Sequence, residues 1–282
     1  MTENAFTTIV SGLKLLKRHP ILLIPAAVHH VAIIYLALLL VFFVLNFNYF
    51  EINSLAVYLA GVLLTLFISS FATAGSVGMA KEVIESGATR SKHLLSYGKK
   101  YTFKLVLAFL FITLIRTVFS LFWQPVLNRV GDMEFNADYV LDALNTDPSL
   151  LLPMFEALAV PVLIAVLATA AYLLLVSFMF YFVSYIIVID NLSVFKSYRK
   201  SFKLLWTRPI RVISFVFLVT VIQMLVTSAS VLLIAVFNHF GFPFLIGLTV
   251  NLVLLILLAA AMNIWVTRFY IILTGKKMAE MQ

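Results

Sequence analysis

Residues 20–45 read PILLIPAAVHHVAIIYLALLLVFFVL and contain no charged side chain. A helix needs about 20 apolar residues to cross the hydrocarbon core of a bilayer, so this segment is long enough to span a membrane. The whole chain has the same character, since 63% of its 282 residues are apolar and 11% are charged. Soluble domains carry about 25% charged residues. The composition therefore excludes both a soluble globule and a disordered chain.

Five further segments resemble the first in length and apolar character. The six predicted spans cover about residues 20–45, 55–80, 105–126, 158–188, 211–237 and 243–273. Each must be helical, because lipid offers no hydrogen-bond partner to the backbone. The predicted fold is all-α: a polytopic six-helix transmembrane bundle of three similarly oriented hairpins, forming a single integral membrane domain over residues 1–282. Residues 127–157 form its one sizeable loop, on the outer side.

The basic residues are distributed unevenly between the segments that join the spans. Sixteen of the 20 lysines and arginines lie before the first span, between spans two and three, between spans four and five, or after the sixth, and Arg211 and Arg268 lie in the adjoining ends of the fifth and sixth spans. The opposite side carries Glu51 and an outer loop with six acidic residues and Arg129. Cytoplasmic loops of membrane proteins are enriched in lysine and arginine. The sequence therefore predicts a multi-pass cell-membrane protein with both termini in the cytoplasm.

A short motif, Lys-Leu-Leu-x-x-x-Pro-Ile, occurs at residues 14–21 and again at 203–210, and five of nine positions match between 13–21 and 202–210. A weaker relative at residues 92–100 precedes the third span. We predict that each hairpin begins with a short basic helix and that Pro20 and Pro209 mark a bend, because a residue before proline avoids helical geometry. Parallel repeats of this kind occur in transporters and also by plain duplication.

The segments of about residues 6–18 and 194–206 are predicted to be amphipathic helices in the headgroup region. Apolar residues recur at helical spacing at positions 6, 9, 10, 13 and 16, and at positions 194, 195, 198, 202 and 205, so one apolar stripe faces inward. Basic residues near an anionic surface attract its lipids. The alternative is that they only determine topology. The candidate anionic-lipid contacts are Lys14, Lys17, Arg18, Lys99, Lys100, Lys196, Arg199, Lys200 and Lys203.

The basic Leu-Leu-x-x-x-Pro pattern before the first and fifth spans resembles a group of six-span prokaryotic membrane proteins. Some of these are labelled as the membrane domain of glycerophosphoryl diester phosphodiesterase, and others resemble the YciC-like family. The resemblance covers nearly the whole chain. It implies a fold and a membrane location and brings no catalytic residue, because the phosphodiesterase activity of fused relatives belongs to a separate soluble barrel domain.

Five polar side chains fall near the middle of four predicted spans, about 12–18 Å from a span end at 1.5 Å per residue. If these residues converge, they form a polar layer able to hold an anion or a lipid headgroup. Charged residues inside spans usually face a bundle interior or a watery cavity. The alternative is that each residue hydrogen-bonds a neighbouring helix and fixes packing. The candidate ligand-binding residues are Arg116, His29, His30, Gln223 and Asn251.

Small residues recur every four positions in the second span, at Ser70, Ala74 and Gly78. Small residues on one face allow two helices to approach closely, so we assign these three to helix packing. Ser76 lies between them, but its surroundings lack the first glycine of a nucleophile elbow. We therefore name no catalytic serine.

The sequence carries no sign of an enzyme. It has no cysteine, no phosphate-binding glycine loop and no paired histidine metal motif, so we predict no catalytic residue, metal or cofactor. Nucleic acid is excluded as a partner because the basic residues adjoin span ends. The predicted function is transport or binding of a lipid or a small amphiphilic or anionic molecule in the polar layer. The alternative is a non-enzymatic scaffold or assembly factor that docks a protein partner, or a second copy, through its basic helices.

The topology is testable by single-cysteine labelling, because the natural chain contains no cysteine. We expect a cysteine at Lys99, or a reporter fused after Gln282, to be cytoplasmic, and a cysteine at Asp142 to react with a membrane-impermeant reagent on intact cells. Labelling of position 142 only from the cytoplasmic face would overturn the topology.

Overall fold

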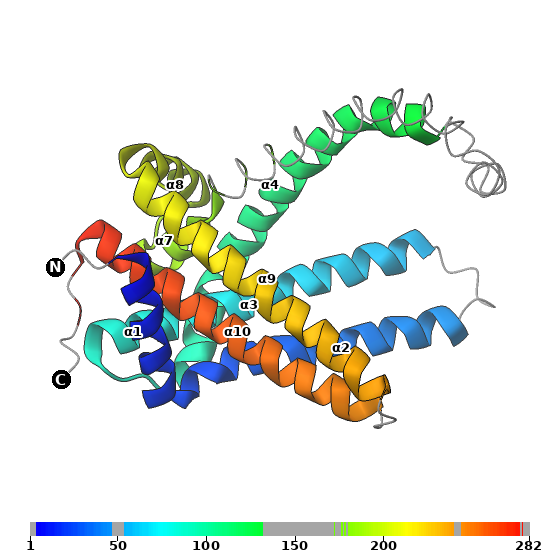
Figure 1. The fold of residues 1–282 in the computed structure, drawn as a ribbon. Helices are drawn as coiled ribbons and strands as arrows, with labels where there is room; N and C mark the ends of the chain where they lie inside the picture. Colours follow the sequence, from blue (N-terminus) through cyan, green and yellow to red (C-terminus); the bar gives the residue numbers. More distant parts are fainter. Residues whose placement is uncertain are drawn as a thin grey trace, which may run out of the picture. The chain divides into compact units, whose positions relative to one another are not determined.

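The computed structural model describes residues 4–46, 54–131, 180–239 and 244–276, together with Tyr172, Val176, Phe178 and Met278. The described elements are all helices (Figure 1). They are α1 (Ala5–Arg18), η1 (Pro20–Leu23), α2 (Ile24–Asn46), α3 (Ser54–Ser86), α4 (Lys92–Gly131), α7 (Val183–Asp190), α8 (Val194–Thr207), α9 (Pro209–His239) and α10 (Phe244–Thr274).

The chain divides into two compact units. The first unit comprises Met1–Phe109 and Phe180–Gln282, and the second comprises Leu110–Met179. Within the second unit, the hydroxyl of Tyr172 donates to the carbonyl of Ile115 in α4, with 3.2 Å between the oxygens. The first unit holds most of the described residues.

Four helices are long and apolar enough to cross a membrane: Pro20–Phe42, Leu59–Ser86, Pro209–Phe237 and Ile246–Thr274. They coincide with the first, second, fifth and sixth predicted spans, so the chain is an all-helical membrane protein. Residues 105–126 lie within α4, which continues through residues 127–131 of the expected outer loop. The rest of that loop and most of the span at 158–188 lie outside the described residues. The count of six spans therefore stays a prediction.

The two short helices predicted before the first and fifth spans, here called the introducing helices, are present as α1 and α8, and each is separate from the span that follows. Helix α1 ends at Arg18, and a 3₁₀ turn begins at Pro20. Helix α8 ends at Thr207, and α9 begins at Pro209. The third copy differs, because α4 runs without a break from Lys92 and no separate short helix precedes it. The segment before the third span has no proline to end a helix.

We expected the apolar residues of each introducing helix to form one inward-facing stripe, but in the structure some of them are buried and others are exposed. On α8, Tyr198 is buried and its hydroxyl donates to the carbonyl of Ala108 at 2.6 Å, whereas the side chain of Phe195 is 73% exposed. On α1, Ile9 is buried and Phe6 is 65% exposed. Both helices therefore carry apolar residues on the face that packs and on the face that does not.

Helix α10 lies at the centre of the first unit, where it contacts α1, α2, α3, α7 and α9. Its aromatic residues fill the interior: Tyr270 is fully buried, and the ring of Phe269 stacks on Phe215 of α9 with 3.8 Å between centroids. Figure 1 shows α9 and α10 running side by side. Although α10 is the last helix in the chain, it therefore packs against spans that come much earlier in the sequence.

Glycines in α3 and α4 bring these two helices into close contact. A Cβ added at Gly78 would overlap the ring of Tyr97, and one added at Gly75 would lie 3.2 Å from the carbonyl oxygen of Leu94. A Cβ at Gly98 would overlap the ring of Phe71. The absence of a side chain on one helix thus makes room for a large side chain on the other.

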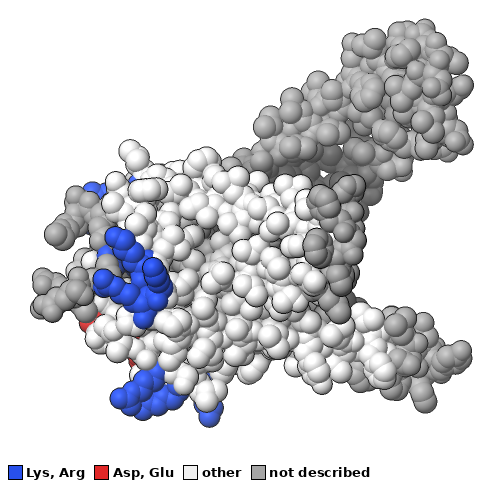
Figure 2. All heavy atoms as spheres, turned by 60° about the horizontal axis from the view of Figure 1, so that its bottom comes forward, with Lys and Arg blue, Asp and Glu red and all other residues white. Residues whose placement is uncertain are grey.

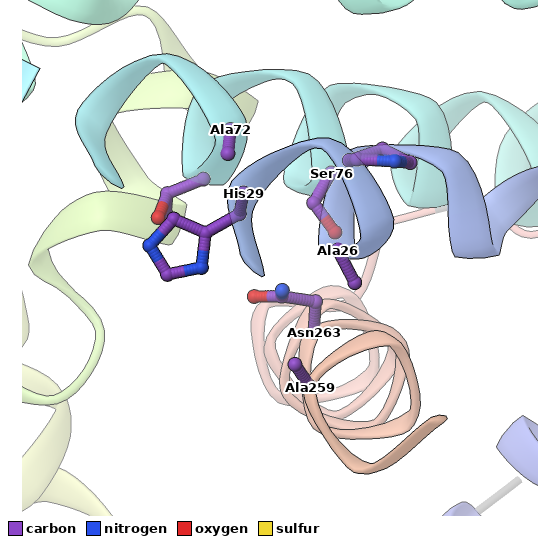
Figure 3. A pocket seen from close by; sticks show the side chains of 8 residues that line it. Ala26, His29, Ala72, Ser76, Ala259 and Asn263 are labelled. Atoms are coloured by element: carbon purple, nitrogen blue, oxygen red, sulfur yellow. The ribbon is translucent and has the colours of Figure 1, made fainter. Parts of the chain in front are cut away.

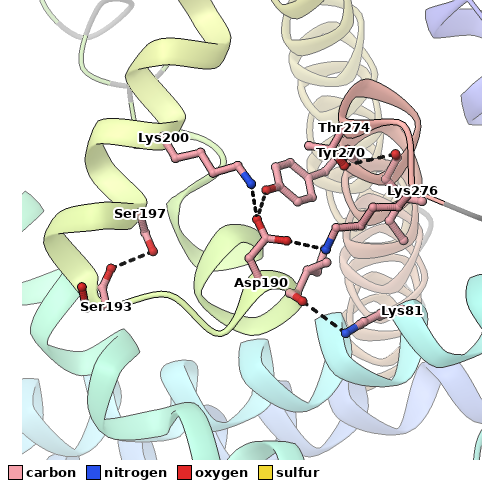
Figure 4. A network of polar contacts seen from close by, with 10 residues as sticks. Lys81, Asp190, Ser193, Ser197, Lys200, Tyr270, Thr274 and Lys276 are labelled. Atoms are coloured by element: carbon pink, nitrogen blue, oxygen red, sulfur yellow. Dashed lines mark hydrogen bonds and ion pairs between the residues drawn. The ribbon is translucent and has the colours of Figure 1, made fainter.

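A carboxylate at the end of α7 joins three helices and the chain's end. Asp190 accepts hydrogen bonds from Lys200 of α8, at 2.6 Å, and from Tyr270 of α10 and Lys276 beyond it (Figure 4). Lys81 of α3 donates to the neighbouring carbonyl of Ile189 at 3.2 Å. We call these residues the Asp190 cluster.

The Asp190 cluster also gathers basic segments that lie far apart in the sequence. Lys81 belongs to the connection after the second predicted span, Lys200 to the connection after the fourth, and Lys276 to the tail. Lys104 reaches the same place and donates to the side-chain oxygen of Asn191 at 3.1 Å. On the face drawn in Figure 2, lysines and arginines gather toward one end of the described surface, and uncharged side chains cover the rest. We call this the basic end.

The Asp190 carboxylate is only 10% exposed. Burial raises the pKa of Asp190, but hydrogen bonds from Lys200, Lys276 and Tyr270 lower it by more, so the pKa lies below its ordinary value. A carboxyl whose pKa falls on folding contributes stability above its unfolded pKa and loses it as the pH falls toward the folded pKa. At neutral pH the Asp190 carboxyl is therefore ionised, and its contribution to the free energy of unfolding is complete.

We expect Asp190→Asn to lower the free energy of unfolding by about 1.5–3 kcal/mol at pH 7, the range for hydrogen bonds to a charged group. The difference from the natural protein should shrink as the pH falls below about 4, the ordinary pKa of aspartate, because the unfolded carboxyl then binds a proton while the folded one is still charged. Unfolding of the purified protein in one detergent, followed at pH 7 and at pH 3, measures both effects.

Glu85→Gln provides the matched control for Asp190→Asn. Glu85 lies 3.9 Å from Lys81 at the surface, and such exposed pairs contribute about 0–1 kcal/mol. Equal losses in the two variants, or a loss for Asp190→Asn that does not change with pH, would contradict the assigned role of the Asp190 cluster.

Candidate functional site

A small polar cavity lies between α2, α3 and α10 in the first unit. Its lining includes His29 of α2, Thr73 and Ser76 of α3, and Asn263 of α10, and Pro25, Ala26, Ala72 and Ala259 complete it. Figure 3 shows the side chains of His29, Ser76 and Asn263 directed toward the space between the three helices. The small alanines leave this space open. The cavity volume is about 40 Å³, enough for a water molecule or one small polar group.

Hydrogen bonds hold two of the lining side chains in place. The Nε2 atom of His29 lies 3.0 Å from the hydroxyl of Ser69. The hydroxyl of Tyr185 in α7 donates to the side-chain oxygen of Asn263 at 3.2 Å. Because α7 ends at Asp190, the same short helix supports the cavity with its tyrosine and anchors the basic end with its carboxylate.

The lining is neutral and mixes donors with acceptors. Hydroxyl, amide and imidazole groups can bind water, an alcohol, or the oxygen of an ester or phosphate group. Among the described residues, no group of three histidine, cysteine or acidic side chains could hold a metal ion. The side chains that line the cavity are suited to hydrogen bonding.

The neighbouring histidines His29 and His30 have different surroundings. His30 Nδ1 lies 2.8 Å from the carbonyl of Ala26 on its own helix. The two rings meet edge to face, with 5.1 Å between centroids. His30 is not among the residues that line the cavity. Successive residues point about 100° apart on a helix, which is why only one of the pair reaches the cavity.

The other candidates for a central polar layer do not line this cavity. Gln223 is exposed on α9. The side-chain oxygen of Asn251 on α10 is buried and has no hydrogen-bond partner among the described residues. Arg116 falls on the part of α4 in the second unit, and its side chain lies outside the described residues. Of the five predicted ligand-binding residues, the structure thus places only His29 in the cavity.

Sequence reasoning missed four residues that line or support the cavity. Asn263 and Thr73 interrupt apolar runs, a signal that is visible in the sequence. The sequence around Ser76 was tested only for a nucleophile motif, whereas the structure places Ser76 in the cavity lining. Tyr185 carries no such signal, because its role depends on how α7 packs. The three packing residues Ser70, Ala74 and Gly78 are all buried, as close helix contact requires.

The candidate anionic-lipid contacts are exposed with one exception. Lys200 is part of the Asp190 cluster and is only partly exposed. Lys100 lies over the ring of Tyr101, 5.1 Å from its centroid. The exposed candidates are Lys14, Lys17, Arg18, Lys99, Lys100, Lys196, Arg199 and Lys203.

Comparison with known families identifies one match. A family described as a domain of unknown function (DUF7847) matches residues 4–273. The chain belongs to the DUF7847 family. No curated protein and no solved structure matches the chain. The resemblance to phosphodiesterase membrane domains and to the YciC-like family stays a prediction.

We expect Asn263→Leu to lower the free energy of unfolding by about 1–3 kcal/mol, because it leaves the buried Tyr185 hydroxyl without its acceptor. Asn251→Leu is the matched control on the same helix. It removes an oxygen that already lacks a partner, so its effect should be neutral or stabilising. Thermal unfolding in one detergent, followed by tryptophan fluorescence, compares the two variants.

A double-mutant cycle tests the assigned partner directly. The double variant Tyr185→Phe/Asn263→Leu should lose less free energy of unfolding than the sum of the losses in the two single variants, because each single change already removes the same hydrogen bond. Additive costs would show that Tyr185 and Asn263 act separately.

Proposed function

We propose that this protein binds or transports a lipid or another small amphiphilic molecule and that the cavity between α2, α3 and α10 takes a polar group of that molecule. The observation that supports this proposal is that His29, Ser76 and Asn263, from three different helices, line one cavity. Polar side chains within a membrane are costly, so their convergence needs a reason. A ligand oxygen bound among them supplies one.

The cavity limits what part of the ligand enters. A volume of about 40 Å³ accepts a hydroxyl, carbonyl or phosphoryl oxygen and excludes a whole headgroup. The remainder of the molecule would lie along exposed apolar side chains such as Val28 and Val31 of α2. The neutral lining favours hydrogen bonding over charge pairing as the basis of selection.

We also propose that the chain crosses the membrane six times with the basic end in the cytoplasm. The meeting of Lys81, Lys200 and Lys276 around one carboxyl group and its neighbouring carbonyl supports a common side for their three segments. Lysine and arginine are enriched on the cytoplasmic side of membrane proteins. Both termini would then be cytoplasmic, and the cavity would lie deeper in the membrane.

A scaffold or assembly factor is the second candidate function. It is supported by the bonds that His29 and Asn263 already make to Ser69 and Tyr185. Such bonds satisfy polar groups without a ligand and fix helix packing.

Ligand binding can be tested with the two adjacent histidines. Purified protein is titrated with short-chain phosphatidylglycerol and phosphatidylcholine in detergent, and the rise in melting temperature reports binding. We expect His29→Ala to weaken binding roughly fivefold, the worth of one hydrogen bond of about 1 kcal/mol. His30→Ala is the matched control, because His30 bonds to its own helix. Equal effects of the two changes, or no binding by the natural protein, would favour the scaffold.

A further inference from the structure

Helices α1 and α8 share one construction. Each contains 14 residues, and each position of α8 lies 189 residues after its equivalent in α1. The hydroxyl of Thr8 donates to the carbonyl of Asn4 at 3.0 Å, and Ser197 donates to Ser193 at 2.9 Å. These contacts occupy equivalent positions at the start of each helix.

The two helices also end alike. The amide of His19 donates to the carbonyl of Leu15 at 2.9 Å, and the amide of Arg208 donates to Leu204 at 3.1 Å. Both of these helix ends are followed directly by a proline at the start of a membrane-crossing segment, Pro20–Phe42 or Pro209–Phe237. Each short helix therefore ends where a span begins, which is the surface of the bilayer.

Both helices present large apolar side chains on their outer faces. The side chains of Phe6 and Leu13 in α1 are 65% and 47% exposed, and their equivalents Phe195 and Phe202 in α8 are 73% and 41% exposed. Trp206 continues the row on α8 at 70% exposure and meets Phe202 edge to face. Aromatic side chains of this kind are enriched where a protein meets the membrane interface.

Basic side chains flank both rows. Neither helix contains an acidic residue. The exposed cations beside the apolar rows are Lys14, Lys17 and Arg18 on α1, and Lys196, Arg199 and Lys203 on α8. A face that combines apolar rings with unopposed cations is complementary to anionic phospholipid, whose phosphates lie just above the acyl chains.

We propose that the outer faces of α1 and α8 are two equivalent docking surfaces for anionic phospholipids of the membrane that holds the protein. The apolar rows enter the boundary between headgroups and acyl chains, and the lysines and arginines bind the phosphates. The proximity of each helix to the start of a span favours lipid over an acidic protein or nucleic acid. This assignment does not depend on the cavity at His29.

Trp206 supplies a built-in probe for the test. The full-length protein in detergent is titrated with brominated phosphatidylglycerol or brominated phosphatidylcholine, and bromine quenches tryptophan fluorescence on contact. The signal of a Trp206→Phe variant is subtracted, because the chain has three tryptophans. We expect half-maximal quenching of Trp206 at a phosphatidylglycerol concentration at least tenfold below that for phosphatidylcholine.

Two sets of variants separate charge from fold. Replacing Lys196, Arg199 and Lys203 by glutamine should remove the preference for phosphatidylglycerol, since each cation changes affinity roughly fivefold. The conservative set Lys196→Arg, Arg199→Lys and Lys203→Arg should keep it. Loss in both sets, or equal quenching by the two lipids in the natural protein, would overturn the proposal.

The equivalence of the two helices has its own test. Leu13→Trp, made together with Trp206→Phe, places the probe on the outer face of α1. We expect the same lipid preference there, and its absence would limit the surface to α8 and reject the proposed pair. Unlabelled phosphatidylglycerol and a poly-glutamate peptide are each added as competitors of the brominated lipid. If the peptide protects Trp206 from quenching and the unlabelled lipid does not, the surface binds an acidic protein and the lipid proposal is rejected. These tests do not use the His29→Ala variant. The cavity proposal and the docking-surface proposal can therefore fail independently of each other.

Discussion

The Asp190 carboxylate is the contact on which the arrangement of the basic end depends. Helices α3, α7, α8 and α10 must come together at one level for Lys81, Lys200, Tyr270 and Lys276 to reach Asp190 and the carbonyl of Ile189 beside it. Spans in lipid gain little from hydrophobic attraction to one another, because the surrounding acyl chains are equally apolar. Polar contacts such as those of Asp190 therefore contribute to the alignment of neighbouring helices.

The cavity near His29 is a consequence of that arrangement. Its walls come from α2, α3 and α10, and α10 is held at the basic end through Tyr270. Tyr185 lies five residues before Asp190 in α7, about one and a half helical turns, and donates a hydrogen bond to Asn263. A displacement of α7 would thus affect both the Asp190 cluster and the cavity. Helix α7 therefore links the cavity, through Tyr185, to the Asp190 cluster.

Much of this fold is predictable from the sequence because the signals are local. Apolar runs identify the spans, and Pro20 and Pro209 determine where the introducing helices end. The partners of Asp190 are not predictable in this way, since Tyr270 and Lys276 lie 80 and 86 positions away. The cavity shows the same limit. Periodicity cannot tell which of two apolar faces packs inward on α8, nor which neighbour Asn263 meets.

The Asp190 cluster places one negative charge among several positive ones, and this imbalance has a consequence for biosynthesis. An excess of lysine resists transfer across the membrane while the chain is being inserted. In the topology proposed above, Lys81, Lys200 and Lys276 would therefore guide insertion of the nascent chain before they bond to Asp190 and the carbonyl of Ile189 in the folded protein. A neutral substitution at any of these lysines would affect both membrane insertion and the contacts of the folded Asp190 cluster. Arginine would keep the positive charge that acts during insertion and would alter only the geometry of those contacts. Natural variation at these sites is thus expected to preserve charge more strictly than shape.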